Sequence, residues 1–230
     1  MKVGVLGGGR MGSGIAHAFL LAGCEVVVVE RDEESADAAR RRIIGMLAKT
    51  VERGSTEATV DELAVGLHTG SDAATFSGCA LIIEAVPEDR ALKTDALAMI
   101  ERAAPDAALA SNTSSISIDD LAARLQHPER MLGLHFFNPV PASALVEIVV
   151  GPATDPDLVE RARTWVRMLD KTPIVVRDSP GFASSRLGVA LALEAIRMLD
   201  SGVASAEDID RAMELGYRHP MGPLRTTDIV

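Results

Sequence analysis

His135 and Glu147 are the two side chains whose types and spacing best fit proton transfer. His135 lies in the segment GLHFFNPVP, where a predicted strand ends, and Glu147 lies in the next predicted strand, LVEIVV. In that strand the carboxylate points to the face opposite its apolar neighbours, and adjoining strands can bring the two side chains together. A carboxylate bonded to one ring nitrogen fixes the tautomer and favours the protonated ring, which leaves the other nitrogen as a usable general base. The alternative is a purely structural histidine–glutamate pair.

A glycine-rich turn near the N-terminus has the pattern of a dinucleotide site. The segment GGGRMG matches G-x-G-x-x-G at Gly7, Gly9 and Gly12, and it follows a predicted strand and opens a predicted helix. The first glycine permits the tight turn, the second admits a pyrophosphate close to the backbone, and the third lets the helix pack close to the strand. The helix N-terminus would offer its N–H groups to the phosphates. We predict that these glycines and Met11 bind the cofactor.

Glu30 indicates which dinucleotide this turn would bind. It ends the second predicted strand, EVVVVE, about 20 residues after the glycine turn, where a carboxylate can accept both ribose hydroxyls of an adenosine. The same negative charge repels a 2′-phosphate, so the sequence favours NAD over NADP. Arg31 weakens this preference, because an arginine at this place can accommodate a 2′-phosphate. The alternative is a plain turn with a solvated Glu-Arg pair.

The elements that must position these residues alternate between strands and helices up to about Pro180. This alternation predicts an α/β fold, with a Rossmann-type doubly wound parallel sheet and helices on both faces. After Pro180 the pattern is helical only. We therefore predict an NAD-binding domain over residues 1–180 and a smaller all-helical domain over residues 181–230. The predicted strands are residues 3–6, 25–30, 79–86, 107–111, 131–137 and 145–150.

The composition excludes several kinds of partner. The formal net charge is −10, which argues against nucleic acid, because phosphate backbones are bound by clustered Lys and Arg. Cys24 and Cys79 lack any metal-ligand or CxxC spacing, so we predict no metal site and expect two free thiols in a reducing cytoplasm. No run reaches the ~18 uncharged apolar residues of a membrane span, so no membrane partner is expected.

Five segments in a fixed order resemble a known enzyme family. They are VGVLGGGRMGSGIA, LIIEAVPED, SNTSSISI, GLHFFNPVP and LVEIV. Together they are similar to the L-3-hydroxyacyl-CoA dehydrogenases, close to the short bacterial 3-hydroxybutyryl-CoA dehydrogenases, and the resemblance runs from Met1 to Val230. It implies a reversible, NAD-linked oxidation of the (S)-3-hydroxyl of a short-chain acyl-CoA to a ketone.

The resemblance also implies roles for individual residues. His135 would take the hydroxyl proton while hydride leaves C3 for the nicotinamide, and Glu147 would orient and charge His135. Ser114, the fourth residue of SNTSS, would hydrogen-bond near the reacting oxygen and the nicotinamide. Asn138 of HFFNP would help to place the nicotinamide end. The positions that match contacts to the cofactor's ribose and its surroundings are Glu88 and Lys93.

The chain departs from the family pattern in two places. Ser185 stands where the family usually has an asparagine that contacts substrate near the catalytic histidine. A hydroxyl is shorter than an amide, so substrate positioning could differ, although we expect a subfamily variant with normal activity. The chain also stops at Val230, before the end of the family's helical domain, which usually forms a homodimer and closes the substrate cleft. We therefore expect a truncated helical domain that leaves Leu224, Ile229 and Val230 as uncovered apolar surface.

Several alternatives stay open at this point. A 3-hydroxyadipyl-CoA, or a free polyol acid or carnitine-like alcohol, would use the same histidine and glutamate. A protein of a different class, which binds nucleotide without turnover, would account for Ser185 and the early end of the chain. The CoA phosphates could meet basic residues of the long helix after Glu30, although a solvated helix face is the more common explanation. These basic residues are Arg40, Arg41, Arg42, Lys49 and Arg53.

Overall fold

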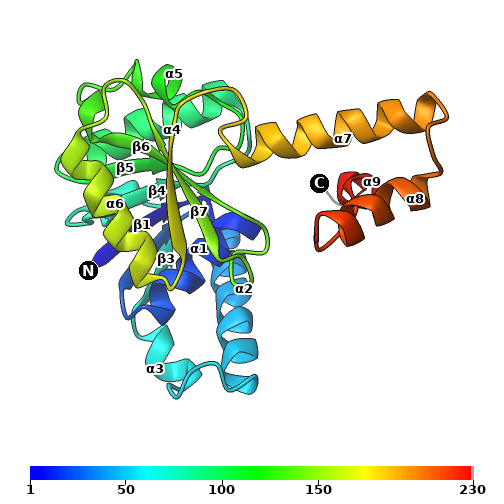
Figure 1. Cartoon of the computed structure of the whole chain (residues 1–230). Helices are drawn as coiled ribbons and strands as arrows, with labels where there is room; N and C mark the ends of the chain where they lie inside the picture. Colours follow the sequence, from blue (N-terminus) through cyan, green and yellow to red (C-terminus); the bar gives the residue numbers. More distant parts are fainter. Residues whose placement is uncertain (229–230) are drawn as a thin grey trace. The chain divides into compact units, whose positions relative to one another are not determined.

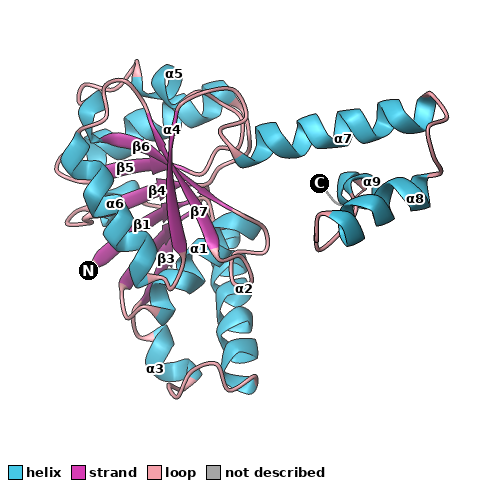
Figure 2. Cartoon of the chain, in the orientation of Figure 1, coloured by secondary structure: helices cyan, strands magenta, loops and turns pink. Residues whose placement is uncertain are grey.

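A computed structural model describes residues 1–228, and the chain forms two compact units, Met1–Ser179 and Pro180–Val230. The described strands all belong to the first unit, and the described part of the second unit is helical (Figures 1 and 2). The predicted fold class, a Rossmann-type α/β sheet followed by a helical domain, is confirmed. The expected exposure of Ile229 and Val230 falls outside the described residues.

The sheet of the first unit has eight strands within the described residues, in the order β3-β2-β1-β4-β5-β6-β7-β8. Every neighbouring pair is parallel except β6 and β7, which run antiparallel, so the prediction of a wholly parallel sheet is wrong at this point. The connection from β6 to β7 is too short for a crossover helix, which needs about a dozen residues or more, and the chain must therefore turn back. The strands are β1 (Lys2–Leu6), β2 (Glu25–Val29), β3 (Leu67–Gly70), β4 (Leu81–Glu84), β5 (Ala108–Ser111), β6 (Met131–Phe136), β7 (Leu145–Val150) and β8 (Thr172–Arg177).

Both edge strands and several helices, α6 (Pro156–Met168) among them, come in addition to the predicted elements. The edge strand β3 has only four residues, LHTG, which show no clear alternation. The other edge strand, β8, begins Thr-Pro, and proline is tolerated at the start of an edge strand because no ladder hydrogen bond is lost there. Helix α6 (Pro156–Met168) begins with proline after Asp155, whose carboxylate accepts a hydrogen bond from the N–H of Asp157.

Helices cover both faces of the sheet (Figure 2). Besides α6, the helices of this unit are α1 (Arg10–Leu21), α2 (Glu33–Glu52), α3 (Val60–Ala64), α4 (Arg90–Ala103), α5 (Ile118–Ala122) and two short 3-10 helices, η1 (Ala73–Phe76) and η2 (Pro128–Arg130). Helices α1, α2 and α6 pack on one face, where Phe19, Ile43 and Trp165 join a single core cluster with the strands. Helices α4 and α5 cover the other face, where Gly133 of β6 leaves room for Ile118 of α5.

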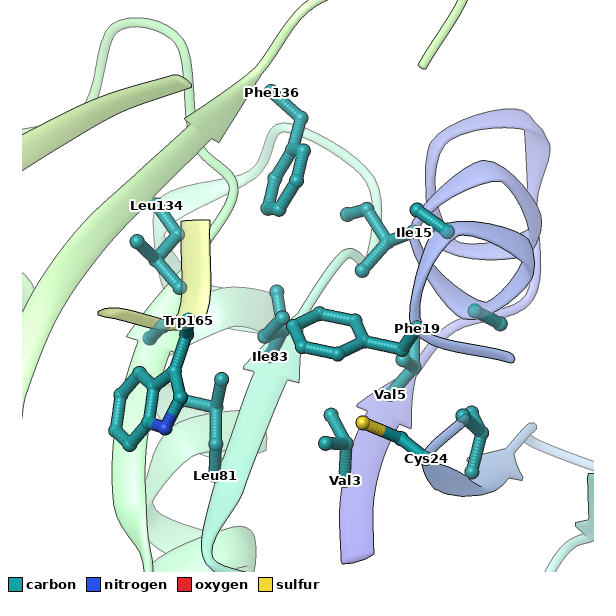
Figure 3. Packing of buried hydrophobic residues seen from close by; sticks show 14 of the residues in the cluster. Val3, Val5, Ile15, Phe19, Cys24, Leu81, Ile83, Leu134, Phe136 and Trp165 are labelled. Carbon is teal, nitrogen blue, oxygen red and sulfur yellow. The ribbon is translucent and has the colours of Figure 1, made fainter. Parts of the chain in front are cut away.

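The core on the first face consists mainly of aliphatic side chains from alternate strand positions. Figure 3 shows Val3 and Val5 of β1 beside Leu81 and Ile83 of β4, with the ring of Phe19 from α1 over them. All five side chains are completely buried. This close packing fixes the spacing of the central strands and therefore of the residues at their carboxyl ends.

The register of four strands places a row of polar side chains on the opposite face, near the carboxyl end of the sheet. Glu84 is the partner of Ser111, Ser111 is the partner of Gly133, and His135 lies two residues beyond Gly133 on the same face. His135 is in turn the direct partner of Glu147. The residue before each of the four polar residues belongs to the core cluster of the first face, as strand alternation requires.

The described part of the second unit is organised around the carboxylate of Asp210, which is 3% exposed. This carboxylate accepts a hydrogen bond from the N–H of Leu224 at 2.8 Å, and a side chain at Gly222 would overlap it. The elements of this unit are α7 (Ser184–Asp200), α8 (Ala206–Arg211), a π-helical turn η3 (Ala212–Gly216) and α9 (Pro223–Thr227). Within residues 1–228 no helix is both long and apolar enough to cross a bilayer.

The packing of the core predicts that a substitution at Ile83 lowers the free energy of unfolding much more than one at an exposed valine. Ile83→Ala leaves a cavity in the core beside the central strand β4 and is expected to lower the free energy of unfolding by about 2–5 kcal/mol. Val65 is 78% exposed, and Val65→Ala should change it by less than about 0.5 kcal/mol. Urea unfolding followed by the fluorescence of Trp165, the single tryptophan, measures both. Equal effects of the two substitutions would contradict the core assignment.

Candidate active site

The glycine turn after β1 is tightly constrained at two of its glycines and open at the third. Gly7 has a φ of +91°, and a side chain there would lie 2.9 Å from the carbonyl oxygen of Ala85. A side chain at Gly12 would overlap the carbonyl oxygen of Gly7. A Cβ atom at Gly9, by contrast, would have no atom within 4 Å. The turn thus has open space at Gly9, which directly precedes α1, and a phosphate there would meet the helix N-terminus.

Two donors hold the carbonyl group of Gly8 in this turn. The hydroxyl of Ser13 donates to the Gly8 oxygen at 2.7 Å, and the guanidinium of Arg42, from α2, donates to the same oxygen. Arg42 is therefore a contact of the glycine turn, and one of its neighbours, Arg40, donates to the carbonyl of Leu67 at 3.1 Å. Arg40 and Arg42 are both exposed, as a solvated helix face predicts, but each also donates to a backbone carbonyl of another segment.

Glu30 lies directly after β2, beside the glycine turn. Its Oε1 atom accepts a hydrogen bond from the N–H of Gly8 at 2.7 Å. The guanidinium of the neighbouring Arg31 pairs with Asp32 at 3.1 Å, and its side chain is 84% exposed. An exposed pair of this kind is weak, so Arg31 is not held firmly. In this structure the Arg31 guanidinium points to Asp32, and the charged side chain that contacts the glycine turn is the carboxylate of Glu30.

His135 and Glu147 form a buried hydrogen-bonded pair. The Nδ1 atom of His135 lies 2.7 Å from Oε2 of Glu147, and the two side chains are 7% and 0% exposed. A carboxylate can only accept, so this hydrogen bond places the shared proton on Nδ1 of His135. The ring of Phe137 lies 4.5 Å from the imidazole, centre to centre, and flanks it.

Glu88 accepts hydrogen bonds from the last three residues of the SNTSS segment, which form a turn after β5. Its Oε1 atom accepts from the hydroxyl of Thr113 at 2.6 Å, from the N–H groups of Ser114 and Ser115 at 3.0 and 3.2 Å, and from the hydroxyl of Ser115 at 3.0 Å. The hydroxyl of Ser114 makes only a long contact, at 3.4 Å. Burial alone would raise the pKa of the Glu88 carboxyl, but these hydrogen bonds and the charge of Lys93 hold the pKa below its usual value.

Lys93 is inside the protein, with 1% of its surface exposed. Its ammonium group contacts Glu84 at 2.8 Å, the carbonyl oxygen of Val86 at 3.1 Å and Glu88 at 3.3 Å. Two of these contacts are hydrogen bonds, and the contact with Glu88 is an ion pair. The predicted contact of Lys93 with the cofactor's ribose stays a prediction, and the two carboxylates also give Lys93 an indirect connection to the site.

Asn112 connects the SNTSS turn to the end of β6. Its side-chain oxygen accepts a hydrogen bond from the backbone N–H of Phe136 at 2.9 Å. The backbone N–H of Asn112 donates to the backbone carbonyl of Glu84 at 2.9 Å. Sequence reasoning missed this residue and Glu84, although each lies inside a segment that it singled out. Their role depends on which strands are neighbours, and the sequence pattern does not give the strand order.

The structure thus brings most of the predicted residues to the carboxyl end of one sheet. The glycine turn and Glu30 follow β1 and β2, the Glu88–Ser114 cluster follows β4 and β5, and His135 lies one residue before the end of β6. Met11 lies in the first turn of α1, and Asn138 is exposed in the loop after β6. Ser185 lies in the first turn of α7, in the second unit. Within residues 1–228 no cluster of metal-binding side chains occurs.

These features define a class of protein. A strand, a glycine turn with open space at the helix N-terminus, and a carboxylate after the second strand together fit a dinucleotide. The carboxyl edge of an open α/β sheet is where such folds bind ligands. A buried histidine–carboxylate pair at the same edge is suited to proton transfer, and the combination is that of a nicotinamide-dependent oxidoreductase.

Comparison with known proteins gives the family. Residues 2–179 match the 3-hydroxyacyl-CoA dehydrogenase NAD-binding domain, and residues 181–230 match the C-terminal domain of the same enzymes. The chain belongs to the 3-hydroxyacyl-CoA dehydrogenase family, as the five segments predict, and it is an NAD-dependent oxidoreductase.

Individual relatives agree with this assignment. A 3-hydroxybutyryl-CoA dehydrogenase of Mycobacterium tuberculosis is 44% identical over 100% of this chain and 82% of its own length. The crystal structure of (S)-3-hydroxybutyryl-CoA dehydrogenase from Ralstonia eutropha matches with a TM-score of 0.95 at 35% identity, over 99% of this chain and 81% of that one. A diketoreductase matches with a TM-score of 0.94 at 29% identity, over 100% of this chain and 83% of that one.

The two kinds of glycine in the turn predict opposite results. Gly9→Ala adds a methyl group in open space, so it should leave the thermal stability unchanged and weaken NADH binding by at least about 10-fold, because the cofactor's phosphates need that space. Gly12→Ala creates an overlap with the Gly7 carbonyl and should lower the melting temperature without any ligand. Thermal unfolding and NADH fluorescence titration measure the two effects. If Gly9→Ala binds NADH with unchanged affinity, the cofactor's phosphates do not bind at this turn.

The place of Glu30 predicts its effect on cofactor affinity. Glu30→Ala removes the acceptor for the ribose hydroxyls and the partner of the Gly8 N–H, so NAD affinity should fall by about 10-fold or more. Titration of NADH and NADPH against both proteins measures this. If Glu30→Ala binds NADH as well as the unchanged chain does, the ribose assignment is wrong.

Proposed function

We propose that this protein oxidises the 3-hydroxyl of a short-chain (S)-3-hydroxyacyl-CoA to the 3-oxoacyl-CoA, reversibly, with His135 as general base. The observation that carries the proposal is the buried 2.7 Å pair between His135 and Glu147 at the carboxyl end of β6. Burial matters because a hydrogen-bonded pair in a dry site keeps its geometry, whereas an exposed pair exchanges with water.

In this proposal the chain's residues position the substrate and move one proton. The Nε2 atom of His135 accepts the hydroxyl proton of the substrate, and the carboxylate of Glu147 stabilises the imidazolium that results. NAD, when bound, supplies the hydride acceptor, and the protein sets the distance and orientation. In the reverse direction His135 returns the proton to the alkoxide oxygen.

The proposed positions of the substrate and the nicotinamide depend on three further residues. Ser114 lies on a turn that Glu88 holds, and its hydroxyl makes only a 3.4 Å contact there, so we assign it to the reacting oxygen. Asn138, exposed after β6, is assigned to the nicotinamide end. Ser185 is assigned to the substrate, with a shorter reach than the asparagine usual in the family.

For the substrate class, two alternatives to a short-chain 3-hydroxyacyl-CoA are specific enough to test. The relatives named above include 3-hydroxybutyryl-CoA dehydrogenases, which favours a short CoA thioester. The diketoreductase of similar fold is described as acting on dicarbonyl compounds, which favours a small ketone without CoA. A dicarboxylic 3-hydroxyacyl-CoA would use the same pair of residues and is the third candidate.

We also propose that the helical unit takes part in forming a homodimer. Helix α7 exposes a series of large apolar side chains, which in water favours burial against another surface. Leu187 is 71% exposed, Val189 58% and Leu193 46%. Sedimentation equilibrium of the protein measures the state, and a monomer at all concentrations would overturn this proposal.

The base assignment predicts a loss of turnover with little loss of cofactor binding. His135→Gln should lower kcat by at least ~10²-fold, because the general base is gone, while the Kd for NADH stays within a few-fold. His127 is the matched control, since its side chain is 56% exposed and pairs with Glu129 on the surface. His127→Gln should keep the kcat of the unchanged protein. Near-normal turnover by His135→Gln would exclude it as the base.

The experiment that tests the reaction follows NADH oxidation with acetoacetyl-CoA and with free acetoacetate side by side. Oxidation with the CoA ester alone supports the proposed reaction and substrate class. Oxidation with free acetoacetate as fast as with the ester would favour a small ketone. No turnover with either substrate, in a protein that binds NADH, would favour a nucleotide-binding relative without this activity.

A further inference from the structure

The fold contains a buried charged cluster that the proposed reaction does not use directly. Glu84, at the end of β4, is completely buried and lies on the same sheet face as Ser111 and His135. Its Oε1 atom accepts hydrogen bonds from the N–H of Val86 at 2.7 Å and from Lys93 at 2.8 Å, and its Oε2 atom accepts from the hydroxyl of Ser111 at 2.6 Å. Burial raises the pKa of the Glu84 carboxyl, and the charge of Lys93 opposes that rise.

Such a cluster is costly, so its retention calls for a physical reason. Removing two charges from water costs several kcal/mol per ion, and an apolar replacement of similar volume is often as stable. Lys93 here lies between two carboxylates, Glu84 and Glu88, and only Glu88 is partly exposed. The cluster therefore connects the interior of the sheet to the edge where the site lies.

Two routes, one of ion pairs and hydrogen bonds and one of hydrogen bonds alone, run from Glu84 to the turn that carries Ser114. The first passes through the ammonium of Lys93 to Glu88, which accepts the N–H groups of Ser114 and Ser115. The second passes through the hydroxyl of Ser111, which donates to Glu84 and accepts from the N–H of Thr113 at 3.2 Å. Both routes end on the same three-residue turn, so a change at Glu84 acts on this turn from both sides.

We propose that Glu84 is a positioning residue for the reaction. Through Lys93 and Ser111 it fixes the turn of residues 113–115 and thereby the hydroxyl of Ser114. Glu84 itself touches neither substrate nor cofactor. This inference rests on the proposed function for the role of Ser114, and it adds the buried charge that holds Ser114 in place.

A double-mutant cycle on the full chain tests the proposal. Glu84→Gln keeps the shape and removes the charge, and Ser114→Ala removes the hydroxyl. Each is expected to lower kcat with acetoacetyl-CoA by about 10-fold, because displacement of a positioning group by about 1 Å has effects of this order or larger. The double variant should lose no more than the worse single variant, since Glu84 acts through Ser114. Multiplied effects, or a silent Ser114→Ala beside an impaired Glu84→Gln, would overturn the proposal.

Glu101 provides the matched control for a merely structural effect. It is another buried glutamate, 7% exposed and outside the site, whose carboxylate accepts from the N–H groups of Gln126 and His127 at 2.9 and 2.8 Å. It lies near the C-terminal end of α4, whereas Lys93 lies near the N-terminal end. Glu101→Gln should lower the melting temperature, and any effect it has on kcat should multiply with that of Ser114→Ala. If it shows the same loss of additivity as Glu84→Gln, the proposal fails.

A second readout separates this inference from the proposed function. Hydrogen–deuterium exchange should show faster exchange at the amides of Ser114 and Ser115 in Glu84→Gln and unchanged exchange there in Glu101→Gln. Exchange rates can be measured without turnover. If the protein without substitutions is inactive, the proposed function is refuted, but the exchange experiment still tests the role of Glu84. Ser111→Ala, a milder change on the second route, replaces Glu84→Gln if that protein does not fold. Unchanged exchange of the turn in the substituted protein would overturn the role of Glu84.

Discussion

The register of β4, β5, β6 and β7 is the constraint on which the rest of this structure depends. It aligns Glu84 with Ser111, and His135 with Glu147, on one face of the sheet. A shift of one residue in any of these strands would exchange the polar and the apolar face, placing charged groups in the core and leucines at the site. The apolar residues that alternate with the polar ones pack against α1 and α6, so the hydrophobic core fixes the register and the register fixes the site (Figure 3).

Burial gives these polar groups their chemical character. His135 and Glu147 are almost out of contact with water, and each satisfies the other at 2.7 Å. Glu84, Lys93 and Glu88 satisfy one another in the same way, and the donors of the SNTSS turn complete the set. In a low-dielectric interior an unpaired buried member, such as Glu147, Glu84 or Lys93, would be strongly unfavourable, so each group holds its partners in a narrow range of positions. A reaction that transfers a proton and a hydride needs that fixed geometry.

The glycine turn and the histidine–glutamate pair meet the chemical requirements of the reaction by different physical means. The turn provides free space and a helix N-terminus, and its tight parts at Gly7 and Gly12 allow no other residue without movement of the backbone. The pair provides a buried imidazole whose Nδ1 atom is held by a carboxylate at 2.7 Å. Both lie at the carboxyl edge of one sheet, where the loops of an α/β fold are free to vary without disturbing the core.

The sequence by itself determined the class of fold, the glycine turn, the acidic residue after the second strand and the histidine–glutamate pair. These are local patterns: strand–turn–helix spacing, strand alternation and motif order are written in neighbouring residues. Only the tertiary structure decided that β7 runs antiparallel to β6, that Lys93 is buried between two carboxylates, and that Asn112 and Glu84 support the SNTSS turn. Those facts depend on which strands become neighbours and on which buried charges must be paired, and both are set by the packing of distant segments rather than by any local pattern.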